Sequence, residues 1–174
     1  AAKENRDYGL AMYVMDIPSY DESTNRLFID AAAAPNVEKT ADQLESRTVD
    51  NNYSAAYFPD VYITDPTNGR RVLAPPSIAA IGAISYNDSV AYPWFAPAGF
   101  NRAALGFVEN VKVRLSTADR DKLYESRINP IATFPNGGFV IFGQKTLQLA
   151  QSALDRVNVR RMLLEVNRQV IGVA

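Results

Sequence analysis

Residues 57–81, YFPDVYITDPTNGRRVLAPPSIAAI, impose a definite order of local structure on the chain. The first part has the aromatic and β-branched residues of a strand, and Asp-Pro and Asn-Gly then mark a tight turn. A second extended piece ends at Pro75 and Pro76, because two successive prolines fix φ and remove two backbone donors. Ser77 is placed to cap the helix that follows. The isoleucines of that helix recur at helical spacing, at Ile78, Ile81 and Ile84.

Strand-like and helix-like segments also alternate through the rest of the chain. We expect strands at 9–19, 54–65, 108–116 and 138–147, and helices at 41–49, 77–89, within 116–129 and at 154–170. Capping boxes predict two helix starts, one from Thr40 with Gln43 and one from Ser116 with Asp119. Residues 19–36 and 128–138 are expected to be loops. This order predicts a mixed α/β (α+β) fold, a single layered domain over 1–174 with a central mixed β-sheet flanked by helices.

Composition removes most enzyme chemistry. The 174 residues contain neither cysteine nor histidine, which excludes disulfides, thiol nucleophiles, histidine bases and most zinc or copper sites. A net charge of −1 gives no general attraction to nucleic acid or to an acidic membrane. The apolar runs are far shorter than the roughly 20 residues of a membrane-spanning helix. We therefore expect no cofactor, no nucleic acid and no membrane among the partners.

Two motifs resemble ligand sites without meeting their requirements. The run GFVIFGQKT at 138–146 approaches a phosphate loop, but Gln144 separates the glycine from Lys145, and the intervening residues are typical of a strand. The acidic residues Asp16, Asp21 and Glu22 lack the glycine and the spacing of a calcium loop. A pair of carboxylates for glycoside hydrolysis remains open, although no pair stands out.

The helix expected at 154–170 carries two rows of apolar residues. The first row is typical of a core-facing stripe and comprises Val159, Met162, Leu163, Val166 and Val170. The second row sets apolar residues among arginines and comprises Val157, Arg161, Leu164 and Arg168. Arginines around small apolar side chains suit a protein interface, and the alternative is that they lie over an ordinary surface helix.

Trp94 lies in a proline-framed aromatic loop, YPWFAPAG. Such a loop packs on its own domain, anchors an interface or stacks on a sugar. The sequence alone leaves these three roles open.

The order of five motifs resembles the core domain of contractile tail sheath proteins of myophages, those of T4-like phages above all. The motifs are YFPDVYITDP followed by PPS, the APAG loop, INPIATFPNGGFVIFGQKTL and VNVRRML. The resemblance extends from about Glu4 onward, except for residues 20–37, where nothing matches. It implies a fragment without the terminal extensions and outer domains of a full sheath subunit.

The resemblance implies a structural protein rather than an enzyme. Sheath subunits stack as hexameric rings in a helical array around the tail tube, and contraction drives the tube through the host cell envelope. The implied partners are other sheath subunits, the tail tube protein, and the baseplate and tail terminator proteins. The implied location is the virion, after assembly in the host cytoplasm. Contacts with the tube or with neighbouring subunits are then expected at Trp94, Arg156, Arg160, Arg161, Leu164 and Arg168.

One alternative stays open at this stage. It is a carboxylate-based hydrolase or a carbohydrate-binding domain that uses the Trp94 loop.

Overall fold

A four-stranded mixed sheet lies at the centre of the protein. The structure is a computed structural model and describes residues 12–27, 35–46, 49–135 and 138–173. The strands of the sheet lie in the order β1 (Tyr13–Asp16), β4 (Ser54–Phe58), β8 (Ile128–Thr133) and β9 (Phe139–Ile141). The first three strands are parallel and β9 is antiparallel to β8. The predicted mixed α+β fold with a central mixed sheet is thereby confirmed.

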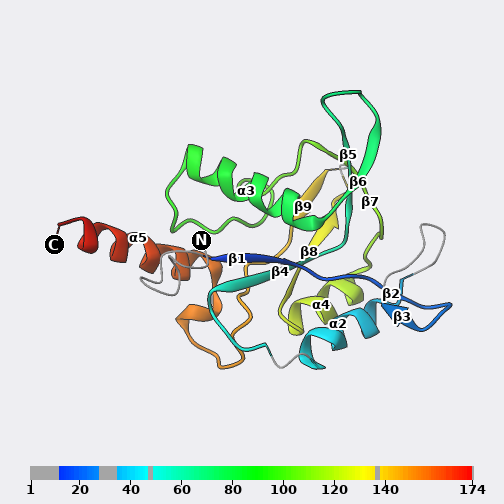
Figure 1. Cartoon of the computed structure of the whole chain (residues 1–174), viewed down its shortest axis with the longest axis horizontal. Coiled ribbons are helices and arrows are strands. Elements are labelled where there is room, and N and C mark those ends of the chain that lie inside the picture. Colours follow the sequence, from blue (N-terminus) through cyan, green and yellow to red (C-terminus); the bar gives the residue numbers. More distant parts are fainter. Residues whose placement is uncertain (1–11, 28–34, 47–48, 136–137, 174) are drawn as a thin grey trace.

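Strand β4 is buried on both faces, and its alternation divides the interior into two cores. Ala55 and Tyr57 belong to the core that includes the alanine face of α3 (Pro76–Val90). Ala56 and Phe58 belong to the core that includes α2 (Val37–Ser46) and α4 (Thr117–Glu125). Figure 1 shows α3 on one side of β1 and β4, and α2 with α4 on the other.

A smaller antiparallel sheet continues from β4. It contains β6 (Arg71–Ala74), β5 (Val61–Thr64) and β7 (Val108–Val111) in that order. The predicted turn between β5 and β6 is confirmed, because Asp65 accepts hydrogen bonds from Thr67 and Asn68, and Gly69 has a φ of 67°. The predicted single strand at 54–65 is wrong. Pro59, which follows a cis peptide bond, and Asp60 separate β4 from β5, so the two halves join different sheets.

Two segments predicted as loops contain strands. Residues 128–133 form β8, which pairs with β4 on one side and β9 on the other despite Pro130. Within 19–36, β2 (Tyr20–Asp21) and β3 (Arg26–Leu27) form a short hairpin. Tertiary pairing outweighs local propensity in the first case, since a buried position between two strands favours the extended backbone.

The helix starts were predicted with mixed success. The capping box at α4 is confirmed, because the Ser116 Oγ accepts from the Asp119 N–H and the Asp119 carboxylate accepts from the Ser116 N–H. The box of Thr40 with Gln43 is wrong, since α2 begins earlier, at Val37. Asn36 caps that helix by accepting from the Lys39 N–H. The Thr40 hydroxyl instead donates to the Asn36 carbonyl and accepts from the Tyr20 N–H.

Helix α3 is capped by a residue from another element. The Asp16 carboxylate, at the end of β1, accepts from the Ser77 N–H at 2.7 Å and from the Ser77 Oγ at 2.9 Å. The sequence predicted that Ser77 caps this helix, and that prediction is wrong, because the cap is Asp16. The predicted isoleucine row is also turned outward, with Ile81 57% exposed, while Ala79, Ala80 and Ala83 face the core. Small side chains let α3 lie close to the sheet.

Replacing Asp16 by alanine is expected to lower the free energy of unfolding by about 1 kcal/mol, the usual cost of losing an N-terminal cap. Ser77→Ala should cost less, because the Ser77 N–H keeps its acceptor. Urea denaturation followed by circular dichroism measures both changes. Equal stabilities for wild type and Asp16→Ala would contradict the cross-element cap.

Candidate interaction site at the root of helix α5

Helix α5 (Val157–Val173) leaves the body beside β1 and extends away from the sheets (Figure 1). It follows a short 3₁₀ turn, η1 (Ala153–Asp155). The segment 143–147, which follows β9, holds the start of α5 through backbone bonds. The Val157 N–H donates to the Gln144 carbonyl at 2.8 Å, and the Thr146 N–H donates to the Asp155 carbonyl at 2.9 Å. The predicted helix at 154–170 is therefore present, but it begins at Val157.

Asn129 fastens this segment to the central sheet. Its side chain is fully buried in β8 and brackets the backbone of Lys145, accepting from the Lys145 N–H at 2.7 Å and donating to the Lys145 carbonyl at 2.9 Å. The same amide donates to the Ala56 carbonyl in β4 at 3.1 Å. One side chain thus joins two sheet strands to the root of α5.

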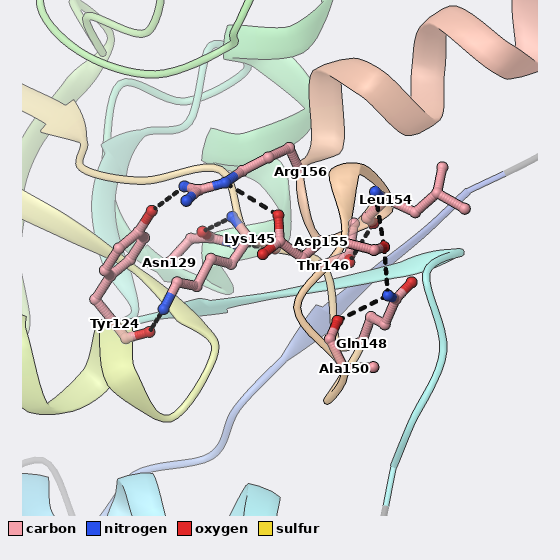
Figure 2. A network of polar contacts seen from close by, with 10 residues as sticks. Tyr124, Asn129, Lys145, Thr146, Gln148, Ala150, Leu154, Asp155 and Arg156 are labelled. Carbon is pink, nitrogen blue, oxygen red and sulfur yellow. Dashed lines mark hydrogen bonds and ion pairs between the residues drawn. The ribbon is translucent and has the colours of Figure 1, made fainter.

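Tyr124, at the end of α4, is the second anchor (Figure 2). The Lys145 Nζ donates to the Tyr124 carbonyl at 2.9 Å and lies 4.1 Å from the centre of its ring. Arg156 donates to the Tyr124 hydroxyl at 2.7 Å and pairs with Asp155 at 3.1 Å. Burial lowers the pKa of the Lys145 ammonium below its ordinary value, and the charge of Arg156 lowers it further.

A cleft of about 930 Å³ opens beside this network. Three cations line it, Arg127, Lys145 and Arg156, together with Glu125 and Asp155. Each cation already donates to the protein, since the Arg127 Nη1 bonds to the carbonyls of Val49 and Leu147. The three cations of the cleft therefore serve to hold segments of the chain together. Lys145, predicted not to belong to a phosphate loop, holds the chain together in this way. Of the strand predicted at 138–147, only Phe139–Ile141 form a strand, β9.

The two apolar rows of α5 are mostly oriented opposite to the expectation. In the predicted core row, Met162 is 38%, Val166 48% and Val170 63% exposed, while Val159 and Leu163 are half-buried. The second row faces the body, where Val157 is buried and Leu164 is 9% exposed. Among the residues that the structure describes, α5 thus packs one apolar side and leaves the other open.

The six predicted contact residues lie in different surroundings. Arg160 and Leu164 are buried within the chain, so neither contributes to its outer surface. Arg161 forms an ion pair with Asp88 of α3, and Arg156 belongs to the Tyr124 network. Arg168 is exposed and pairs with Glu165 at 2.8 Å on the same helix. Sequence reasoning missed Tyr124 and Asn129, which have no local signal because their partners are distant in the chain.

Trp94 and Tyr92 form an aromatic shelf next to α5. The Trp94 ring stacks on that of Tyr92, with centroids 4.6 Å apart and planes 3° from parallel, and both rings remain exposed. The Asn158 side chain donates to the Trp94 carbonyl at 3.1 Å and ties the shelf to the helix. The shelf therefore presents aromatic surface beside the open side of α5.

An apolar groove of about 230 Å³ lies on the inner side of the helix, between β1, α3 and α5. Tyr57 and Arg161 contribute to its walls. Burial raises the pKa of the Tyr57 phenol to about 12, although the charge of Arg161 acts in the opposite direction.

No cluster of three acidic, histidine or cysteine side chains suited to a metal ion occurs within the described ranges. In the same part of the chain, no helix has the length and apolar character needed to cross a membrane.

Comparison with known proteins finds relatives that are all tail sheath proteins of phages. The chain is 40% identical over 114 residues to a tail sheath protein of Vibrio phage KVP40, and 32% identical over 114 residues to the tail sheath protein of Enterobacteria phage T4. Both matches cover 66% of this chain but only 16% and 17% of those proteins. No protein-family model matches the chain.

Solved structures share the fold. The sheath complex of an extracellular contractile injection system (PVC) in the contracted state aligns with a TM-score of 0.65 and 23% identity, covering 80% of this chain and 37% of that one. The contracted baseplate structure of the anti-feeding prophage aligns with a TM-score of 0.69 and 22% identity, covering 98% and 43%. Over the matched two thirds of its length, this chain is therefore a relative of phage tail sheath proteins.

Proposed function

We propose that this chain is part of a structural subunit of a contractile tail sheath. The subunit polymerises as a helical array around a tail tube, and its contraction drives the tube through the host cell envelope. The observation that carries this proposal is the 40% identity to a tail sheath protein across two thirds of the chain. Neither the comparisons nor the described residues favour the hydrolase or carbohydrate-binding alternative, and we propose a role without catalysis.

The proposed partners are other sheath subunits in hexameric rings, the tail tube protein, and the baseplate and tail terminator proteins. The proposed location is the tail of the virion after assembly in the host cytoplasm. We further propose that residues 1–174 act as one core domain of the subunit. Rigid-body movement suits such a subunit, because contraction exchanges contacts between copies while each copy keeps its internal packing.

The open side of α5 and the neighbouring shelf are the proposed contact surface. Its exposed members are Met162, Val166 and Val170 of the helix, together with Arg168 and Trp94. Arg156, Arg161 and Leu164 support this surface from within, since their side chains pack against or bond to the body of the chain. Exposed apolar residues in a continuous stripe are typical of surfaces that a partner covers.

Changing Val166 and Val170 to aspartate in the complete sheath protein tests this surface. Because burying one such side chain contributes about 1.5 kcal/mol, the protein concentration needed for assembly should rise at least about tenfold. Negative-stain microscopy and sedimentation measure the assembly. Thermal unfolding should be unchanged, as both side chains are exposed.

Leu73→Asp is the matched control, because Leu73 is about as exposed as Val166 but lies in β6 of the smaller sheet. Its assembly should equal that of the wild type. Normal sheaths from the Val166, Val170 variant would refute the surface. A wild-type protein that never forms striated cylinders would refute the proposed function itself.

A further inference from the structure

The cleft of about 930 Å³ at the root of α5 carries positive charge that the chain does not fully neutralise. Three cations line it against two acids. Arg156 pairs with Asp155, while Arg127 and Lys145 form no ion pair among the described residues. Burial lowers the pKa of the Lys145 ammonium, and the charges of Arg156 and Arg127 lower it further. The three cations are therefore close enough to repel one another.

Two of these cations keep N–H bonds for a ligand. The Lys145 ammonium has three N–H bonds, and its one acceptor among the described residues is the Tyr124 carbonyl. The Arg156 guanidinium uses Nη1 for the Tyr124 hydroxyl and Nε for Asp155. Its Nη2 has no acceptor within the described ranges and is not buried, since the side chain is 43% exposed. Both cations line the cleft, so a ligand in the cleft reaches them.

The positions of the two cations favour an acidic peptide. Lys145 and Arg156 bond to opposite ends of Tyr124, its backbone carbonyl and its phenol hydroxyl (Figure 2). A peptide with several acidic residues offers a carboxylate to each cation, whereas a small anion offers its oxygens at one point. A nucleic acid carries a charge at every phosphate and would also bring charge against Glu125 and Asp155.

The lip of the cleft adds apolar surface in an ordered loop. Leu149 lines the cleft and is 61% exposed, and its N–H donates to the Asp50 carboxylate at 2.8 Å. The Gln148 amide donates to the Ala150 carbonyl at 2.8 Å and to the Ser152 Oγ at 2.6 Å. A loop that is already bonded in this way loses little conformational entropy on binding. An exposed leucine beside cations suits a protein partner better than a free ion.

We propose that this cleft binds an acidic segment of a protein partner. One carboxylate of the segment binds Lys145, a second binds Arg156, and an apolar part of the segment covers Leu149. The site includes none of the exposed residues on the open side of α5. It therefore goes beyond the proposed contact surface, and its test does not depend on sheath assembly.

A hexaglutamate peptide is the probe, added at low salt to the isotope-labelled chain and followed by NMR spectroscopy. We expect shift changes at the backbone amides of residues 145–156 that saturate with a single Kd. Hexalysine is the control peptide and should leave these amides unchanged. Added salt should weaken the binding of hexaglutamate, because it screens the attraction between the charges.

Two opposite charge changes at exposed positions of the cleft test its place without altering the bonds of Tyr124. Glu125→Gln should lower the Kd about threefold and Gln151→Glu should raise it about threefold, the effect of a unit charge about 6 Å away in water. Both side chains are exposed, so the melting temperature should stay unchanged. Glu22→Gln, the same charge change in the hairpin of β2 and β3, is the matched control and should leave the Kd unchanged.

Three results would overturn the proposal. One is a Kd that responds to neither Glu125→Gln nor Gln151→Glu, and another is shift changes spread over the whole chain. The third comes from competition, in which inorganic phosphate and an oligothymidylate should displace hexaglutamate only weakly. If either displaces it at equal or lower concentration, the cleft is a site for small anions or for nucleic acid, and an acidic segment is not its ligand.

Discussion

Asn129→Ala is expected to lower the free energy of unfolding by about 3–5 kcal/mol. The substitution leaves three backbone groups without their partner, the buried carbonyl of Ala56 and the half-buried carbonyl and N–H of Lys145. Each buried group left unsatisfied costs about 1–3 kcal/mol. Since a domain is stable by only about 5–15 kcal/mol, a loss of this size brings the chain close to unfolding.

Chemical denaturation monitored by circular dichroism measures this loss. Asn110→Ala is the matched control, because the Asn110 side chain is only half buried and its hydrogen bond is a local one, accepted from the neighbouring Val111 N–H. The control should lose less than about 1 kcal/mol. Similar losses for the two variants would show that Asn129 does not join the sheet to the root of α5.

Gly143→Ala is expected to cost about 3 kcal/mol, for two separate reasons. Gly143 has a φ of 129°, a conformation that a residue with a Cβ adopts only with strain of about 1–3 kcal/mol. A Cβ there would also lie 2.6 Å from Cε2 of the Tyr124 ring and 3.2 Å from the Asn129 Oδ1. Displacing that ring disturbs its bonds to Lys145 and Arg156, and overpacking of this kind costs about 1–3 kcal/mol.

Thermal unfolding of Gly143→Ala and of Gly106→Ala gives the comparison. A Cβ on Gly106 meets no atom within 4 Å, so that control should change the stability by less than about 1 kcal/mol. Adding Tyr124→Ala to Gly143→Ala should cost less than the sum of the two single changes, because the clash is removed once. Strict additivity would show that the ring and the glycine do not share one constraint.

Local signals in the sequence were predictive where the structure they specify is also local. Asn68-Gly69 predicted the turn between β5 and β6, and Ser116 with Asp119 predicted the start of α4, because each signal involves neighbouring residues only. Strand β8 was missed since its stability comes from pairing with β4, more than seventy positions earlier, as in Phe58 with Pro130. The Asp16 cap of α3 was missed for the same reason.

Periodicity predicted α5 correctly as an amphipathic helix but could not choose its inner face. Both rows of apolar residues have helical spacing, and a solvated arginine has the same sequence signal as a buried one. Arg160 faces inward because it stacks on the Tyr53 ring, and Arg161 because it forms an ion pair with Asp88. Both partners are far away in the chain. The candidate site was therefore predictable as a helix with arginines, while its pairing was not.

The open helix acts mechanically as a cantilever. Its 17 residues span about 25 Å at 1.5 Å per residue, and its attachment is confined to the first turns and the 143–147 segment. A rotation of about 10° at the attachment moves the free tip by about 4 Å, roughly the width of a side chain. A change at Asn129 or Gly143 too small to unfold the chain would therefore still displace Val170 by about the width of a side chain. The contact of a partner with α5 would then depend on the packing of the core, through the angle of this one helix.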